Sequence, residues 1–279
     1  MKVLITGADG LLGSNLVREL LEKNISVRVL IQPGSRSRSL DGLTLEKVIC
    51  DLFDEGGSLV EAMRGCDAVF HCAAITDQWA DPKLVWKVNL VGTKRVLDAC
   101  IETKIKKLVF VGSASSFQFG TIENPGDESA PFPEIYRGVA YMESKYKATE
   151  LVKEYVKTRG VDAVIVSPTF LLGPYDSRPS SGELIRQFIK RKMKSTSPGG
   201  RNFVYARDAA KAMVSALDKG KRGECYILGG ENLTYLDFFS RVAKKVGMSP
   251  PRRVLPGPVI LAAGAAGSLF QKISGKKFS

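Results

Sequence analysis

The stretch that decides the fold is Val3-Leu4-Ile5-Thr6-Gly7-Ala8-Asp9-Gly10-Leu11-Leu12-Gly13. Its apolar start predicts a buried strand, and the apolar residues at 12, 16, 17, 20 and 21 predict a helix directly after it. The glycines are spaced Gly-x-x-Gly-x-x-Gly, which allows a tight turn, close approach of the backbone to a pyrophosphate and close helix packing. Because a helix N-terminus binds phosphate, the stretch predicts a dinucleotide site, with an unliganded glycine turn as the alternative.

The rest of the first half alternates apolar runs with helical patterns. Runs at 27–31, 45–50 and 68–74 predict the second to fourth strands, and those at 108–111 and 163–168 predict the fifth and sixth. Parallel strands need helical crossovers of this kind. The sequence therefore predicts an α/β fold, a Rossmann-type doubly wound parallel sheet.

Tyr141 and Lys145 lie four residues apart in Tyr141-Met142-Glu143-Ser144-Lys145. On a helix this spacing puts both side chains on one face. An ammonium beside a phenol stabilises the phenolate, so we expect it to lower the tyrosine pKa from its free value near ~10. The pair predicts acid–base catalysis, and an ordinary solvated helix pair is the alternative.

These features together resemble the extended short-chain dehydrogenase/reductases, also described as the NAD(P)-dependent epimerase/dehydratase family. The resemblance extends over roughly Met1 to Pro256, and segments 173–179, 202–210 and 223–234 are similar to dihydroflavonol-reductase-like and hopanoid-associated sugar epimerase-like proteins. It implies an enzyme that transfers a hydride between a nicotinamide and a carbonyl or alcohol of a small organic or sugar-derived substrate. A nucleotide-sugar epimerase or dehydratase and a non-catalytic NAD(P)-sensing protein are the alternatives.

The resemblance also implies roles for individual residues. The catalytic residues would be Ser115, Tyr141 and Lys145, with Ser113 and Ser116 as rivals for the serine position because a serine-rich strand end also caps loops. Asn89 would support the catalytic helix region from inside the fold. The residues expected around the cofactor are Gly7, Asp9, Gly10, Leu11, Leu12, Gly13, Gln32, Arg36, Arg38, Asp51, Leu52, Ala73, Ala74, Asn89, Ser113, Pro168 and Leu171.

Cofactor preference depends on the end of the second strand, which reads Gln32-Pro33-Gly34-Ser35-Arg36-Ser37-Arg38. An acidic residue there would bind the ribose hydroxyls of NAD, and this segment has none. Arg36 and Arg38 suit the 2′-phosphate of NADP, because guanidinium contacts phosphate in a bidentate manner. NADP is therefore the preferred cofactor, NAD is the second choice, and a flexible basic loop is the alternative.

The substrate side is less defined. The expected contacts are Gln78, Trp79, Phe117 and Arg201, the last resembling an arginine that binds the nucleotide phosphate in sugar-modifying relatives. The basic run Arg186, Lys190, Arg191, Lys192 and Lys194 could attract an anionic small-molecule substrate or be a solvated helix face. We place the cofactor domain at 1–172 and 208–228, the second stretch as a helix and a seventh strand. Residues 173–207 and 229–279 form a smaller, discontinuous substrate lobe that is either naturally short or truncated.

Composition excludes several other classes. The net charge is +12, but no aromatic interleaving or nucleic-acid module accompanies it, so nucleic-acid binding is not expected. The single histidine, His71, excludes a multi-histidine metal site and a Ser-His-Asp hydrolase, and the five cysteines show no metal spacing. No transmembrane span is expected, because the apolar stretch 259–270 is too short and predicts a packed or membrane-surface helix. A cytoplasmic enzyme with reduced thiols and a homodimer are further hypotheses.

Overall fold

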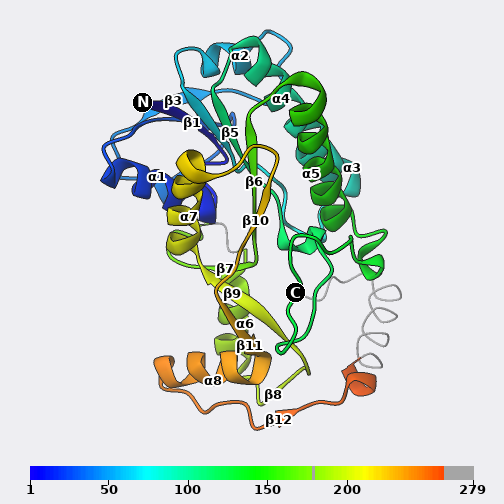
Figure 1. The fold of residues 1–279 in the computed structure, drawn as a ribbon. Coiled ribbons are helices and arrows are strands. Elements are labelled where there is room, and N and C mark those ends of the chain that lie inside the picture. The colour runs from blue at the N-terminus through cyan, green and yellow to red at the C-terminus, as the bar shows by residue number, and fades with distance from the viewer. Residues whose placement is uncertain (178–179, 261–279) are drawn as a thin grey trace. The chain divides into compact units, whose positions relative to one another are not determined.

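The computed structural model describes residues 1–177 and 180–260 (Figure 1). It divides into two compact units, each built from two stretches of chain. The first is Met1–Ser181 with Val204–Gly230, and the second is Gly182–Phe203 with Glu231–Ser279. The predicted division into a cofactor domain and a substrate lobe is a functional one and stays a prediction. The apolar segment predicted as a helix over 259–270 lies, beyond Ile260, outside the described residues.

A seven-stranded parallel sheet forms the centre of the first unit, in the order β10-β6-β5-β4-β1-β2-β3, which confirms the doubly wound fold. The strand order reverses between β1 and β4, and open sheets of this type bind ligands outside the carboxyl ends of the strands at that point. The strands are β1 (Lys2–Thr6), β2 (Ser26–Ile31), β3 (Glu46–Ile49), β4 (Ala68–His71), β5 (Lys107–Val111), β6 (Ala163–Pro168) and β10 (Cys225–Leu228), and a short β7 (Phe170–Leu172) follows β6.

Helices cover both faces of this sheet (Figure 1). One face carries α1 (Leu11–Glu22) and α7 (Ala206–Lys219). The other carries α2 (Ser58–Met63), α4 (Gly92–Glu102) and α5 (Ala140–Arg159). The remaining segments are α3 (Pro82–Trp86), the π-helical turn η2 (Lys87–Val91) and the 3-10 turns η1 (Arg38–Leu40), η3 (Ala114–Ser116) and η4 (Glu134–Tyr136).

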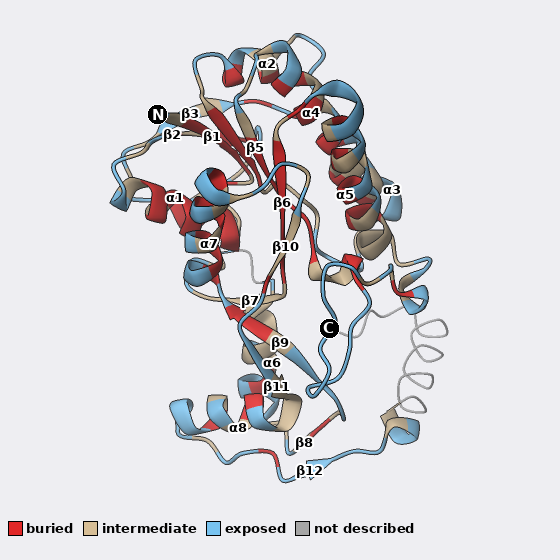
Figure 2. Ribbon diagram, viewed as in Figure 1, coloured by how far each residue is buried: buried red, intermediate tan, exposed pale blue. Residues whose placement is uncertain are grey.

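The core of the first unit follows from strand alternation. In β1, Val3 and Ile5 pack in the cluster with α1 and α7, whereas Leu4 packs in the cluster with α4 and α5. Successive side chains of a strand point to opposite faces, so a strand covered on both faces is apolar throughout. Figure 2 shows the resulting burial along the central strands.

Strand β4 ends at His71, earlier than the predicted end at Ala74. The reason is the turn at Gly7, which packs against the chain just after β4. A Cβ on Gly7 would lie 2.6 Å from the Ala73 nitrogen. The Ala73 amide donates to the Thr6 hydroxyl at 3.3 Å, so it is not available to a strand ladder.

Strand β10 lies at one edge of the sheet, and a long loop between η3 and α5 is attached to it. The Glu128 carboxylate accepts a hydrogen bond from the backbone amide of Ile227 in β10 at 2.6 Å. The Phe132 ring of the same loop stacks on Tyr146 of α5, with 4.7 Å between ring centroids. The loop that leads from the serines to Tyr141 is therefore fixed at two places.

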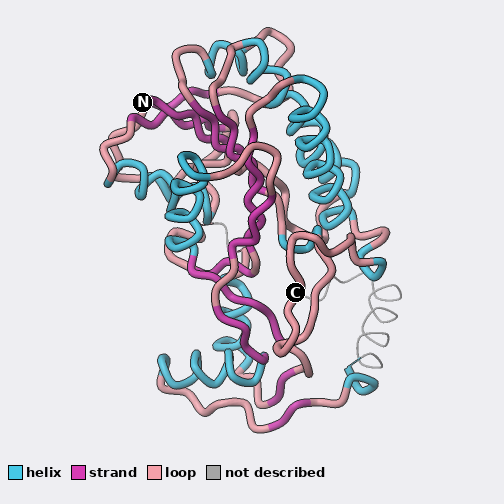
Figure 3. The backbone as a smooth tube through the Cα atoms, viewed as in Figure 1, coloured by secondary structure: helices cyan, strands magenta, loops and turns pink. Residues whose placement is uncertain are grey.

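The second unit is smaller. Its elements are α6 (Gly182–Arg191), β8 (Ser195–Thr196), most of β9 (Gly200–Tyr205), β11 (Glu231–Thr234), α8 (Tyr235–Val246) and β12 (Arg253–Val254). Figure 3 distinguishes the helices, strands and loops of the chain by colour. Strands β9 and β11 pair antiparallel, with Asn202 opposite Asn232. Phe188 stacks on Phe239 at 4.8 Å and Phe203 on Phe238 at 4.2 Å, which gives this unit an aromatic core. Across residues 1–177 and 180–260, no helix combines the length and apolar character needed to cross a bilayer.

Candidate active site

The glycine turn after β1 leaves room for a ligand backbone. Gly7 has φ of +67°, a conformation that favours glycine. A Cβ on Gly13 would lie 2.2 Å from the Gly7 carbonyl oxygen, so helix α1 can pack on this turn only without a side chain there. Gly10 is the N-cap of α1, no side chain caps the helix, and its first turn carries no acidic residue. The amides of this helix start therefore fit a pyrophosphate.

The loop after β2 is tied to the phosphate turn. Asp9 accepts a hydrogen bond from the Ser35 hydroxyl through its carboxylate, and another from the Ser39 hydroxyl through its carbonyl, both at 2.8 Å. The sequence did not indicate this tie, because it joins residues on different elements. Gln32, Arg36 and Arg38 are exposed on the attached loop, while Leu11 and Leu12 are buried behind the turn.

Four other expected cofactor contacts follow two of the strands, two of them after β3 and two after β4. Asp51 is exposed, and its carboxylate accepts from the Phe53 amide at 2.9 Å, which is a local turn bond. Leu52 beside it is buried. Ala73 and Ala74 follow β4 and are half-buried, with Ala73 against the Gly7 turn.

Tyr141 meets the serine cluster at the end of β5. The half-buried phenol makes a hydrogen bond with the Ser113 side chain. The Ser113 and Ser115 hydroxyl oxygens are 2.8 Å apart. Ser113 therefore lies between Tyr141 and Ser115, the catalytic serine expected from the sequence. Ser116 Oγ is buried and finds no partner among the described residues. Burial raises the pKa of Tyr141, and the hydrogen bond to Ser113 partly offsets this.

Lys145 does not lower the Tyr141 pKa in this structure, so that expectation is wrong. Its ammonium donates to the Val111 carbonyl at 2.5 Å and lies 4.7 Å from the centroid of the Phe110 ring. The residue is only 4% exposed, and burial lowers its pKa to about 8. The helix does bring Tyr141 and Lys145 to the end of β5, but each has its own partner there.

This buried ammonium predicts a pH-dependent stability. Between about pH 8 and the ordinary lysine value of 10.5, the unfolded chain holds a proton that the folded chain has released. The free energy of unfolding of the wild type, relative to Lys145→Met, should therefore rise by about 3 kcal/mol across this window. Urea titrations of the cofactor-free protein at pH 7, 8, 9 and 10 measure the difference. Lys147→Met, an exposed lysine of the same helix, is the matched control, and a difference independent of pH would contradict the prediction.

Asn89 is buried in η2 and holds the start of α5. Its amide nitrogen donates to the Ser144 hydroxyl and to the Ile75 carbonyl, both at 3.0 Å, and its oxygen accepts from the Ile75 amide at 2.8 Å. These contacts are of the supporting kind that the sequence resemblance implied. They show no surface through which Asn89 would bind a cofactor directly.

The remaining predicted residues are dispersed. Pro168 ends β6 opposite Leu228, and Leu171 lies in β7. Gln78 and Trp79 are exposed after β4, with Trp79 92% exposed, whereas Phe117 is buried behind η3. In the second unit, Arg201 donates to the Tyr235 hydroxyl at 2.7 Å.

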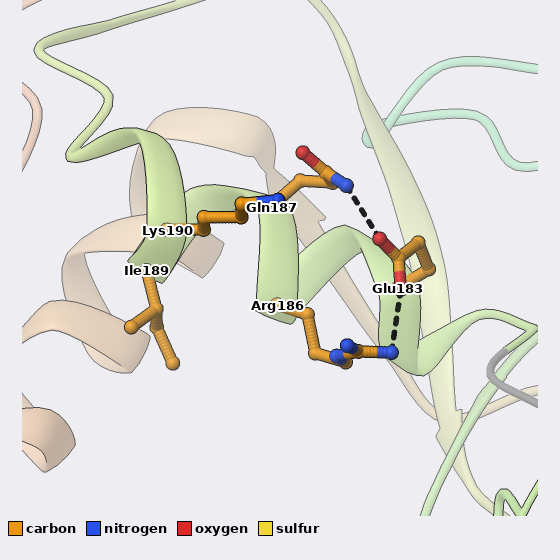
Figure 4. Close-up of a pocket in the computed structure, with 5 residues that line it drawn as sticks. All are labelled: Glu183, Arg186, Gln187, Ile189 and Lys190. Carbon is orange, nitrogen blue, oxygen red and sulfur yellow. Dashed lines mark hydrogen bonds and ion pairs between the residues drawn. The ribbon is translucent and has the colours of Figure 1, made fainter. Parts of the chain in front are cut away.

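The basic run lies along and after α6, where a small pocket opens on the helix surface (Figure 4). Glu183 forms an ion pair with Arg186 at 3.2 Å and accepts a hydrogen bond from Gln187 at 2.5 Å. The pocket is lined by these three residues with Ile189 and Lys190. The positive charge of the basic run is thus partly neutralised by Glu183 of the same helix. Among the described residues, no group of three or more His, Cys, Asp or Glu could hold a metal ion.

The chain is similar to one known protein family and to several known proteins. The model of the NAD dependent epimerase/dehydratase family matches residues 3–229. The chain is 33% identical over 258 residues to a Synechocystis protein named as a candidate dihydroflavonol 4-reductase, covering 90% of this chain and 74% of that one. It is also 33% identical over 263 residues to sterol demethylase protein B of Methylococcus capsulatus, covering 92% and 78%. The structure of a UDP-glucose 4-epimerase from Thermus thermophilus with NAD superposes with a TM-score of 0.78 at 25% identity, covering 95% and 93%.

Proposed function

Because the chain belongs to the NAD dependent epimerase/dehydratase family, we propose that it reduces the carbonyl of a small organic substrate, with NADP(H) as its preferred cofactor and Tyr141 as the proton donor. The broader assignment, an NAD(P)-dependent oxidoreductase of the extended short-chain dehydrogenase/reductase type, follows from the family and its relatives. The glycine turn and the start of α1 fit the pyrophosphate of such a cofactor. When bound, its nicotinamide supplies or accepts the hydride.

The observation that supports a reductase is the position of Tyr141, whose half-buried phenol makes a hydrogen bond with Ser113 of the serine cluster at the end of β5. Burial raises the pKa of this phenol, which favours the protonated form that a proton donor needs. A carbonyl that becomes an alkoxide needs a proton donor, whereas oxidation of an alcohol begins by removing a proton. We assign Tyr141 to proton donation, and the hydroxyl pair Ser113 and Ser115 to hydrogen bonding of the developing oxyanion. We assign Lys145 to the nicotinamide ribose.

An epimerase is the second candidate function, because one similar structure is named as such. A structure with this fold is named as a UDP-glucose 4-epimerase, and an epimerase oxidises its sugar transiently and returns the hydride. The test is absorbance at the nicotinamide band with a panel of carbonyl compounds and nucleotide sugars. Net NADPH consumption supports the reductase. Sugar interconversion without net consumption would replace it with the epimerase, and cofactor binding without either outcome would indicate a sensor.

The cofactor preference predicts an asymmetric effect of two arginines. Arg36→Ala and Arg38→Ala should each weaken NADPH binding by about tenfold or more and leave NADH binding nearly unchanged, because only NADPH carries the 2′-phosphate. Dissociation constants from fluorescence titration at fixed ionic strength measure this. Arg64→Ala, beyond α2, removes the same charge at a distance and serves as the control. Equal losses for both cofactors would refute the phosphate contact.

The homodimer and the cytoplasmic location stay predictions.

A further inference from the structure

A continuous set of buried hydrogen bonds leads away from the phosphate turn. Thr6, the last residue of β1, directly precedes Gly7, and its hydroxyl lies 2.6 Å from Nδ1 of His71 at the end of β4. The other ring nitrogen, Nε2, lies 3.1 Å from the Thr93 hydroxyl in α4. Thr6, His71 and Thr93 are each at most 1% exposed. The histidine thus connects β1 and β4, the two strands between which the strand order reverses, with helix α4 on one face of the sheet.

The set has one consistent direction of donation. The Thr93 hydroxyl donates to the Asn89 carbonyl at 2.7 Å, so it accepts from His71 Nε2–H. Nδ1 then carries no proton and accepts from the Thr6 hydroxyl, which itself accepts from the Ala73 amide. This arrangement requires a neutral ring. Burial and the nearby charge of Lys145 lower the pKa of His71 to about 3, in keeping with that state.

The hydrogen bonds continue from Asn89 to α5, the helix that carries Tyr141. Asn89 donates to the Ser144 hydroxyl at 3.0 Å, and Ser144 donates to the Tyr141 carbonyl at 2.9 Å. Asn89 lies in the π-helical turn η2, and such turns occur frequently at functional sites. Residues far apart in the sequence are therefore connected from the phosphate turn to the backbone of Tyr141.

We propose that His71 is a positioning residue: in its neutral Nε2–H form it connects the phosphate turn to the helix start that carries Tyr141, so that cofactor binding and placement of the phenol depend on each other. Its task at the reacting centre rests on the proposed function of Tyr141. The connection itself is a property of the folded chain and can be observed without turnover.

The first test uses the fact that His71 is the only histidine. Imidazole nitrogens of a uniformly ¹⁵N-labelled sample give one pair of signals, with no assignment needed. We expect the Nε2–H pattern, unchanged from pH 5.5 to 8.5, and a shift of these signals on addition of NADPH and in Ser144→Ala. An Nδ1–H pattern, a titrating ring or signals indifferent to NADPH would overturn the proposal.

The second test breaks the connection at Thr93. Thr93→Val should lower kcat by about tenfold, while the Kd for NADPH changes by less than about threefold, because the bond between Thr6 and His71 remains. Thr93→Ser keeps the hydroxyl and should restore kcat. Thr103→Val removes a hydroxyl that makes the same bond to the carbonyl four residues back in α4, and it serves as the control for stability. His71→Phe, which keeps an aromatic ring beside Phe110, should lower kcat as Thr93→Val does.

The outcomes separate the two ideas. If the wild-type protein reduces a carbonyl compound and Thr93→Val does so with the same kcat per folded molecule, the positioning role is overturned and the reductase assignment stands. If no carbonyl compound is reduced but the His71 signals respond to NADPH and to Ser144→Ala, the reductase fails and the connection stands.

Discussion

Tyr141→Phe should lower kcat by about 10²- to 10⁴-fold and leave the Kd for NADPH unchanged. The substitution removes only the hydroxyl that makes the hydrogen bond with Ser113, and loss of a positioned general acid costs rate in this range. The rate of NADPH consumption with a reducible carbonyl, together with a separate cofactor titration, measures both quantities.

The control for this variant lies on the same helix. Tyr146 packs against Phe132, so Tyr146→Phe keeps its ring contact and should retain kcat within about twofold. If Tyr141→Phe turned over as fast as the wild type, Tyr141 could not be the proton donor, and a serine of the cluster would have to take that task.

Gly13→Ala should have the second large effect, because its new Cβ would lie 2.2 Å from the Gly7 carbonyl oxygen. Helix α1 would have to move away from the turn. We expect a loss of about 1–3 kcal/mol in the free energy of unfolding, as for other overpacked sites, and loss of measurable NADPH binding. Urea unfolding of the cofactor-free protein and fluorescence titration with NADPH are the measurements.

Two other glycines give matched comparisons. A Cβ on Gly10 would make an ordinary contact of 3.4 Å with the same oxygen, so Gly10→Ala should fold normally and lose affinity only because its methyl group obstructs the pyrophosphate. Gly92→Ala, in α4, places its Cβ 3.6 Å from Leu52 and should keep both stability and binding. Wild-type stability and affinity in Gly13→Ala would show that the turn is not packed as described.

The sequence predicted those parts of the molecule that depend on neighbouring residues. Apolar runs identified the strands of the sheet, and the glycine spacing identified the turn after β1. The spacing of Tyr141 and Lys145 correctly placed both on one helix, α5. Local patterns are sufficient here, because strand burial and helix periodicity are set within a few residues.

The parts that the sequence did not predict depend on contacts between distant segments. The Lys145 ammonium donates to a carbonyl of β5, and nothing in the helix pattern indicates that partner. The serine that contacts Tyr141 is set by the 3-10 turn η3, in which the Ser113 side chain accepts from the Ser115 amide. His71 has its partners 65 and 22 residues away in the chain, so its place in the hydrogen-bond set has no periodic signal.

The contact between Glu128 and Ile227 has a consequence for association between molecules. An edge strand exposes backbone groups that can pair with a strand of another chain, which is a common route to aggregation. The Glu128 carboxylate takes up one such amide of β10, so the loop between the serines and Tyr141 also shields the sheet margin. Removal of the Glu128 carboxylate would therefore leave this amide of β10 open to pairing with another chain and should make the protein associate more readily.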